Sequence, residues 1–109
     1  MYTDNTNFIS LAAGARTNLF KKKFGEDKKI SIVMTNIPVE IGKGVLGIYP
    51  KKYKFDFLEN LGLNIYLESE EDIDKFCSLV ACGSGFCYKI FNMYKENAEL
   101  LNFETQFDF

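Results

Sequence analysis

The stretch at residues 8–14 reads FISLAAG, and it decides the fold class. A short apolar run that closes on a glycine predicts a buried strand ending in a turn. Residues 15–24 predict a helix, because their apolar positions share one face, lysines occupy the last turn and Gly25 follows as a stop signal. A strand followed at once by a helix is typical of an α/β unit.

The later segments repeat this alternation. We expect strands at residues 30–34, 45–49 and 63–67, a loop at 35–44, a short helix at 55–61, and a helical pattern from Ser69 to about Asn102, interrupted at Gly83–Gly85. Ser69, with Asp72 three residues later, is typical of a capping box at a helix start. The order β-α-β-loop-β-α-β-α favours an α/β sheet with right-handed crossovers.

Composition excludes several classes of function. The chain has 109 residues, enough for one domain and too few for two ordinary ones. Its net charge of −2 argues against a nucleic-acid partner, and no apolar run approaches the roughly 18 residues that span a membrane. The absence of histidine removes histidine-based catalysis and histidine metal ligands. An odd count of three cysteines, and no targeting pattern at the polar N-terminus, indicate a reducing, cytoplasmic location.

Cysteines and charged runs offer no clear site of their own. Cys77, Cys82 and Cys87 are five residues apart, which places successive ones about 140° apart around a helix, so we expect core packing and no metal site. The lysines at 21–23, 28 and 29 suggest a phosphate site, but such a run is more typical of a solvated helix end.

Four motifs occur in order along the chain: FISLAAG at 8–14, VMTNIP at 33–38, GKG at 42–44 and CGSG at 82–85. Each is weak alone, but the four in series are specific. The chain resembles the middle of the pyrroline-5-carboxylate reductase family over about residues 8–101. That family carries an I-S-x-A-A-G strand end, an M-[PT]-N-T-P loop and an S-G-S-G-P-A helix start.

The resemblance implies a partial Rossmann-like sheet (β-α-β-β-α-β) followed by a long C-terminal helix. Residues 1–68 would be the C-terminal half of a dinucleotide-binding domain, and residues 69–109 the start of a helical dimerisation domain. The family passes a hydride from NADPH or NADH to the C=N carbon of 1-pyrroline-5-carboxylate, which gives L-proline. Because the nicotinamide supplies the chemistry, no side chain of this protein is expected to be catalytic.

The resemblance also implies site residues. Those expected to bind the cofactor, NADP or NAD, are Ala12, Ala13, Gly14 and Asn36. Those expected to bind the substrate are Gly83, Ser84, Gly85 and, less directly, Glu71. A helix N-terminus suits the substrate carboxylate. Purely structural roles for the same residues remain open: a plain strand end at 12–14, a turn residue at 36, and close helix packing at 83–85.

Departures from the family pattern shape the expected function. Phe86 stands where the family has proline, Ile37 where it has threonine, and Ile32 where arginine is common. No G-x-G-x-x-G turn follows the first strand, and the Ser-Pro-Gly-Gly-Thr-type loop of the family's helical domain is missing. We therefore expect a truncated reductase that is inactive alone, with a homo-oligomer or a complementing chain that carries the missing N-terminal half.

Two alternatives to that interpretation remain. One is a small non-enzymatic interaction protein that dimerises through an apolar stripe at Phe86, Ile90, Phe91 and Tyr94, since an exposed stripe of this length favours association. The other is an independent miniature reductase, for which binding of NADPH would be the deciding observation.

Overall fold

The computed structural model describes residues 5–103. Its elements are β1 (Asn7–Ser10), α1 (Thr17–Phe24), β2 (Lys29–Met34), the 3-10 helix η1 (Ile37–Ile41), β3 (Gly44–Tyr49), α2 (Asp56–Glu59), β4 (Gly62–Tyr66), α3 (Glu70–Phe76), the π-helix η2 (Cys77–Cys82) and α4 (Gly83–Leu100). Each predicted strand and helix is present. The predicted loop at 35–44 contains η1, which begins with a proline in its first turn.

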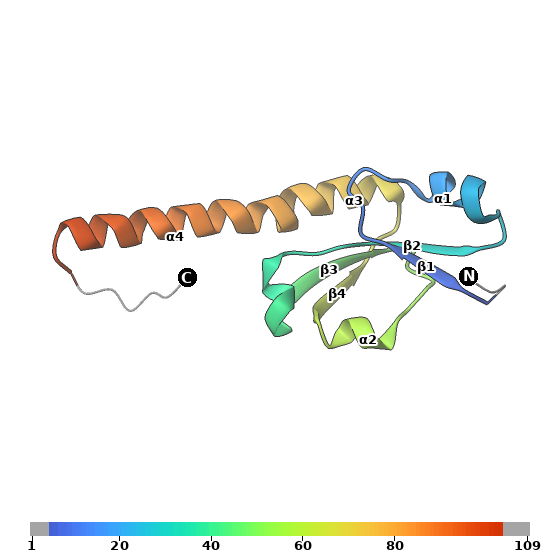
Figure 1. The fold of residues 1–109 in the computed structure, drawn as a ribbon, viewed down its shortest axis with the longest axis horizontal. Helices are drawn as coiled ribbons and strands as arrows, with labels where there is room; N and C mark the ends of the chain where they lie inside the picture. Colours follow the sequence, from blue (N-terminus) through green and yellow to red (C-terminus); the bar gives the residue numbers. More distant parts are fainter. Residues whose placement is uncertain (1–4, 104–109) are drawn as a thin grey trace.

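The four strands form one mixed sheet in the order β1-β2-β3-β4 (Figure 1). β1 and β2 pair in parallel, as do β3 and β4, whereas β2 and β3 are antiparallel. The structure is therefore α/β, with a partial Rossmann-like sheet followed by a long C-terminal helical segment, as predicted. The division into domains at residue 69 stays a prediction.

Both faces of the sheet are covered, which places apolar residues on both sides of β2. Ile32 and Met34 pack with Ile73 and Phe76 of α3 on one face, and Val33 packs with Leu58 of α2 on the other. Figure 1 shows α3 and α2 on opposite sides of the strands. This arrangement explains why consecutive residues of β2, from Ile32 to Met34, are apolar, since alternate side chains point to opposite faces.

Two glycines are required by this packing. A Cβ at Gly47 would lie 2.8 Å from the ring of Phe76, so the glycine lets α3 approach the sheet. Gly62, which opens β4, has a φ of 144°, and a Cβ there would lie 1.9 Å from the carbonyl oxygen of Gly44. Only glycine combines that backbone conformation with so close a neighbour.

The helical pattern after Ser69 differs from the prediction in one respect. The interruption expected at Gly83–Gly85 is wrong, because Gly83 has helical angles of φ −58° and ψ −39° and α4 runs through all three residues. The irregularity comes earlier, in η2, where the backbone widens to a π-helix. The Ser69 capping box is present, with Asp72 accepting from the Ser69 backbone N–H at 3.3 Å.

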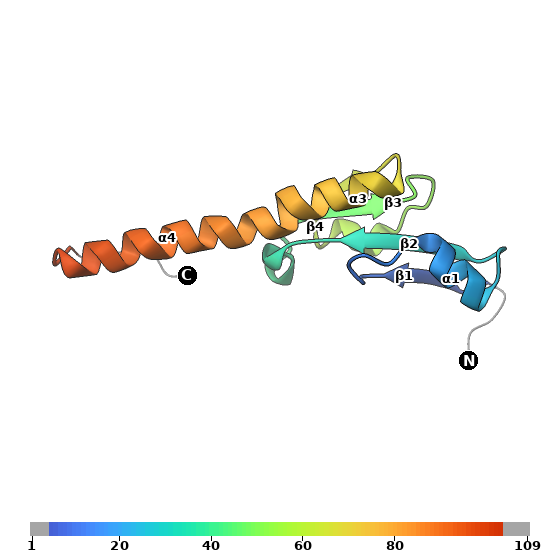
Figure 2. The ribbon, with the colours of Figure 1, turned by 90° about the horizontal axis from the view of Figure 1, so that it is seen from above.

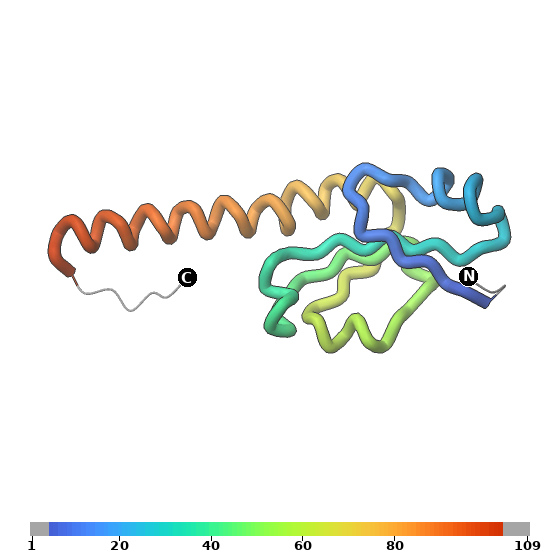
Figure 3. The backbone as a smooth tube through the Cα atoms, in the orientation of Figure 1, coloured from blue at the N-terminus to red at the C-terminus, as the bar shows by residue number. Residues whose placement is uncertain are grey.

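The helix α4 extends away from the sheet, as Figures 2 and 3 show. The molecule measures 61 × 26 × 24 Å, and none of the 18 residues of α4 is buried. Within residues 5–103, no helix combines the length and the apolar character that crossing a membrane requires.

Candidate functional site

Asn36 lies directly beyond β2 and joins the sheet to the last helix. Its Oδ1 accepts from the backbone N–H of Val45 at 2.9 Å, and its Nδ2 donates to the hydroxyl of Ser84 at 3.2 Å. That hydroxyl donates in turn to the carbonyl oxygen of Val80 at 2.8 Å. The chain of hydrogen bonds fixes the orientation of the Asn36 amide and holds the first turn of α4 against the strand end.

A cavity of about 530 Å³ adjoins this hydrogen-bonded chain. The residues that line it come from the strand end, η1, η2 and α4: Asn36, Pro38, Leu79, Val80, Gly83, Ser84, Cys87, Tyr88 and Phe91. A mostly apolar hollow of this size, with a few polar groups, is typical of small-molecule sites. An added Cβ at Gly83 or Gly85 would meet nothing within 4 Å, so there is open space beside both glycines.

The hydrogen-bonding capacity of this site follows from the contacts already made. The Ser84 hydroxyl donates to Val80 and accepts from Asn36, which leaves one lone pair for a ligand N–H. The Asn36 amide retains its second N–H for an acceptor such as a carboxylate oxygen. The buried Thr35 hydroxyl, one residue before Asn36, has no hydrogen-bond partner in the structure. Thr35 does not line the cavity, so the site offers one donor from Asn36 and one acceptor from Ser84.

The structure brings together only some of the residues singled out from the sequence. Asn36, Gly83 and Ser84 line one cavity, while Gly85 lies next along α4 and does not. Ala12–Gly14 form an exposed turn after β1, in which the Ala15 N–H donates to the Ala12 carbonyl. Since β1 and β2 are parallel, this turn lies at the same end of the sheet as Asn36. It does not line the cavity.

Glu71 lies in a different hollow, of about 580 Å³, near the start of α3. There Arg16 donates to the Glu70 carbonyl oxygen and to the Asp74 carboxylate, both at 2.5 Å. The Thr17 backbone N–H donates to the Glu70 carboxylate at 3.0 Å. These contacts tie α1 to α3, so this acidic region acts as a structural joint between two elements.

Sequence reasoning missed Val80 and Tyr88, which an argument from the helical face of Ser84 and Phe91 could have found. Val80, Ser84, Tyr88 and Phe91 recur at spacings of four, four and three, which places them on one face of a helix. The stripe singled out from the sequence instead emphasised Phe86 and Tyr94, which are 70% and 71% exposed and line no part of this cavity.

The core packing expected for the three cysteines is wrong, because Cys82 and Cys87 are exposed and Cys77 is only partly buried. They form no metal site, since no group of three potential ligands gathers within residues 5–103. Burial raises the pKa of the Cys77 thiol, and the nearby Cys82 adds to the shift. Cys77 is therefore a thiol at neutral pH and a poor nucleophile. Cys87 lines the cavity and is exposed.

The glycines at 42, 44 and 47 spell G-x-G-x-x-G, but they do not form a phosphate-binding turn. Gly44 and Gly47 lie inside β3, and no helix follows them directly. Their role is packing, because a Cβ at Gly44 would lie 2.9 Å from Val39, and Gly47 accommodates Phe76. A dinucleotide pyrophosphate needs a glycine turn that opens a helix. Residues 42–47 therefore do not supply a pyrophosphate-binding turn.

Comparison with solved structures tests the family resemblance. Over 88% of its length, this chain superposes with a TM-score of 0.75 and 29% identity on a pyrroline-5-carboxylate reductase from Coxiella burnetii. The resemblance to the pyrroline-5-carboxylate reductase family is confirmed. No protein-family model matches the chain, and no curated protein matches its sequence.

Two further reductases share the fold at lower identity. The Plasmodium falciparum pyrroline carboxylate reductase, solved with NADP bound, has a TM-score of 0.75 and 19% identity over 90% of this chain. The Streptococcus pyogenes 1-pyrroline-5-carboxylate reductase has a TM-score of 0.76 and 18% identity over 88%. The chain spans 38%, 42% and 40% of the lengths of the three reductases.

Proposed function

We propose that this chain supplies the substrate-facing part of an NAD(P)H-dependent pyrroline-5-carboxylate reductase, and that these 109 residues do not catalyse the reaction alone. The Asn36–Ser84 hydrogen bond carries the proposal, because it links two of the four family motifs at the wall of one cavity. The reductase neighbours support the reaction class.

The roles of the side chains follow from the geometry of the cavity. The free lone pair of Ser84 suits the N–H of a protonated cyclic imine, and the second N–H of Asn36 suits its carboxylate. The open space beside Gly83 admits a ring close to the helix backbone. Leu79, Tyr88 and Phe91 form an apolar side of the cavity. A bound nicotinamide would supply the hydride; these residues hold and orient the imine.

A partner is part of this proposal. The sheet ends at β1, so the other edge of β1 has no strand beside it within residues 5–103. An open edge presents backbone N–H and C=O groups that pair readily with another strand. We propose that a complementing chain, or a second copy, extends the sheet here and supplies a grip on the dinucleotide pyrophosphate.

The test is a titration of the isotope-labelled full chain with L-proline and, separately, with NADP⁺, followed by amide NMR shifts. We expect proline to shift the amide resonances of Gly83–Gly85. The Ser84→Ala variant should bind proline about tenfold more weakly, because it loses a charge-assisted hydrogen bond. Ser78→Ala is the matched control, since the Ser78 hydroxyl also bonds a carbonyl one turn back, at 3.0 Å, but lines no part of the cavity.

Two results would overturn the proposal. Proline shifts that are absent, or that are lost equally in both serine variants, would remove the substrate-facing role. Steady oxidation of NADPH by the chain alone with pyrroline-5-carboxylate would show that no complementing chain is needed and would favour the miniature reductase.

A second candidate function rests on the exposed apolar side chains of α4. Phe86, Ile90 and Tyr94 are 70%, 53% and 71% exposed, and they favour a non-enzymatic protein that dimerises through this helix. Light scattering distinguishes the two functions. A dimer that Tyr94→Glu dissociates and that binds neither proline nor NADP⁺ favours the interaction protein, while a monomer with no bound nucleotide rejects it.

A further inference from the structure

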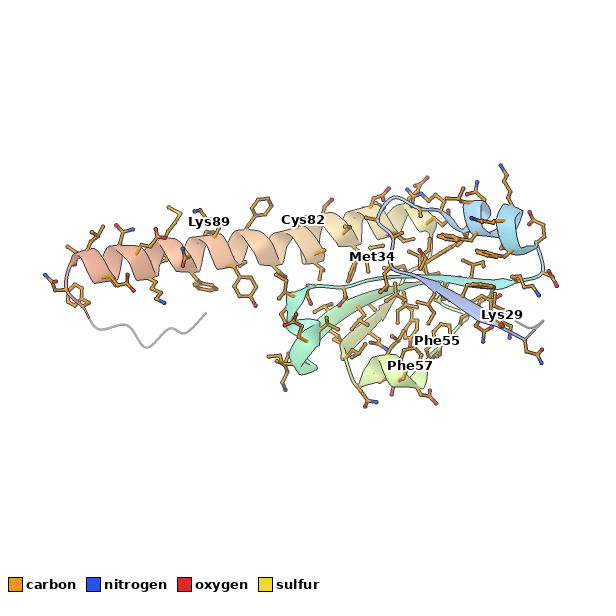
Figure 4. The ribbon with its side chains drawn as sticks, in the orientation of Figure 1. Lys29, Met34, Phe55, Phe57, Cys82 and Lys89 are labelled. Carbon is orange, nitrogen blue, oxygen red and sulfur yellow. The ribbon has the colours of Figure 1, made fainter. Side chains whose placement is uncertain are left out.

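Two lysine-rich segments that are far apart in sequence meet at the end of the sheet opposite Asn36. Lys21 lies in α1 and Lys29 opens β2, while Lys52 and Lys54 follow β3. Because β2 and β3 are antiparallel, with Ile32 opposite Tyr49, the start of β2 adjoins the segment that leaves β3. Figure 4 labels Lys29 at this end of the molecule, away from Met34.

The lysines line two adjoining hollows. One, of about 210 Å³, is lined by Asn7, Lys29, Lys52, Tyr53, Lys54 and Phe55. The other, of about 100 Å³, includes Lys21, Lys28 and Thr17, and it shares Lys52 and Tyr53 with the first. We call the two together the lysine cleft. No aspartate or glutamate is among the residues that line it in the described part of the chain.

Three of the five lysines of the cleft lie beside aromatic rings. The Nζ atoms of Lys29 and Lys52 lie 5.8 and 5.0 Å from the centre of the Tyr53 ring. Lys54 lies 5.3 Å from the ring of Tyr66. A ring contact of this kind orients the ammonium group but leaves its full positive charge for a ligand. By contrast, Lys51, which does not line the cleft, is paired with Glu68 at 2.6 Å.

We propose that the lysine cleft binds a short oligophosphate, with one phosphate group in each hollow. Clustered ammonium groups repel each other unless an anion lies between them, and lysine is a common phosphate ligand. Two small hollows that share Lys52 suit two linked phosphates better than one. The neutral side chains of Asn7 and Tyr53 supply additional hydrogen-bond donors.

The charge of the rest of the molecule favours a short anion over a nucleic acid. Taking the five positive charges of the cleft from the net charge of −2 leaves −7 on the remaining residues. A long polyanion would meet that negative surface, whereas an oligophosphate stays within the cleft. The cleft is also separate from the Asn36 cavity, because the six residues of β2 place about 20 Å between its two ends.

Isothermal titration of the full chain with tripolyphosphate, pyrophosphate and inorganic phosphate at low salt tests the proposal. We expect saturable binding that weakens in that order. Lys52→Gln, which removes the charge shared by both hollows, should weaken tripolyphosphate binding about tenfold. The matched control is Lys89→Gln on α4, which should stay within about twofold because it removes the same charge from a distant exposed site. Circular dichroism checks the fold of both variants.

Three results would overturn it. They are no saturable tripolyphosphate binding, an equal loss in Lys52→Gln and Lys89→Gln, or displacement of tripolyphosphate by an RNA oligonucleotide that binds more tightly. The last result would assign the cleft to nucleic acid. Proline titration reports on the Asn36 cavity independently, so failure at one site is distinguishable from failure at the other.

Discussion

The sheet with its flanking helices and the helix α4 differ in how they are stabilised. Ile32 and Ile48 are fully buried in the sheet, whereas no residue of α4 is buried. The sheet owes its fold to side chains that it contains itself. The helical state of α4 rests on backbone hydrogen bonds, on local pairs such as Asn92–Glu96 at 2.8 Å, and on continuation from α3 through η2.

This contrast separates a region that contains its own buried core from a helix that contains no buried residue. A helix of 18 residues is only marginally stable alone in water, and docking α3 on the sheet provides the first turns from which α4 continues. The candidate cavity lies at the junction of the two regions. Its shape therefore depends on the least supported element of the fold.

The largest expected effect comes from matched truncations of isoleucine in the two regions. Ile48→Ala should lower the free energy of unfolding by about 2–5 kcal/mol, because it leaves a cavity in the fully buried layer between the sheet and α2. Ile90→Ala on α4 should change it by less than about 0.5 kcal/mol, since that side chain is 53% exposed. Urea denaturation measures both, and comparable losses would show that α4 packs as a core element.

Two glycine-to-alanine substitutions, one in each region, should change stability by intermediate amounts and with opposite signs. Gly47→Ala should destabilise by about 1–3 kcal/mol, because the new methyl group meets the Phe76 ring at 2.8 Å. Gly85→Ala meets nothing within 4 Å and should stabilise α4 by up to about 1 kcal/mol through higher helix propensity. Denaturation measures the first and amide hydrogen exchange within α4 the second. A destabilising Gly85→Ala would show that another surface closes on the helix there.

The smallest expected effect is a pH dependence confined to the docked helix α3. The hydrogen bonds from Lys75 and Ser69 lower the pKa of Asp72 below 3.8. The capping contribution of Asp72 is therefore present above that pH and is lost as the pH falls through the lowered value. Asp72→Asn should remove this acid-dependent part of stability. Thermal melts at neutral pH and near pH 3 measure it, and unchanged pH dependence in the variant would contradict the assignment.

Much of the fold could be predicted because its signals are local. The strand at Ile30–Met34 shows as an apolar run, and the start of α3 shows as a capping box. The meeting of Asn36 and Ser84 followed from the family resemblance alone, since no local pattern links residues 48 positions apart. The two glycines led to the wrong prediction of an interruption in the last helix. Gly83 and Gly85 lie within a helical segment that has already begun before them.

The parts that could not be predicted depend on tertiary pairing. Lys29 and Lys52 come together only through the antiparallel register of β2 and β3. The glycine spacing at 42, 44 and 47 reflects packing, because Gly47 lies in β3 against the ring of Phe76. In both cases the residue type indicated the chemistry of the side chain, but the sequence did not indicate which residues surround it in the fold.

The π-helix at Cys77–Cys82 carries an evolutionary consequence. A π segment amounts to one extra residue accommodated within an α-helix. Loss of a single codon there would restore a regular spiral and rotate the remainder of the chain by about 100°. The Ser84 hydroxyl would then face away from Asn36, although every other residue of the protein had been inherited intact.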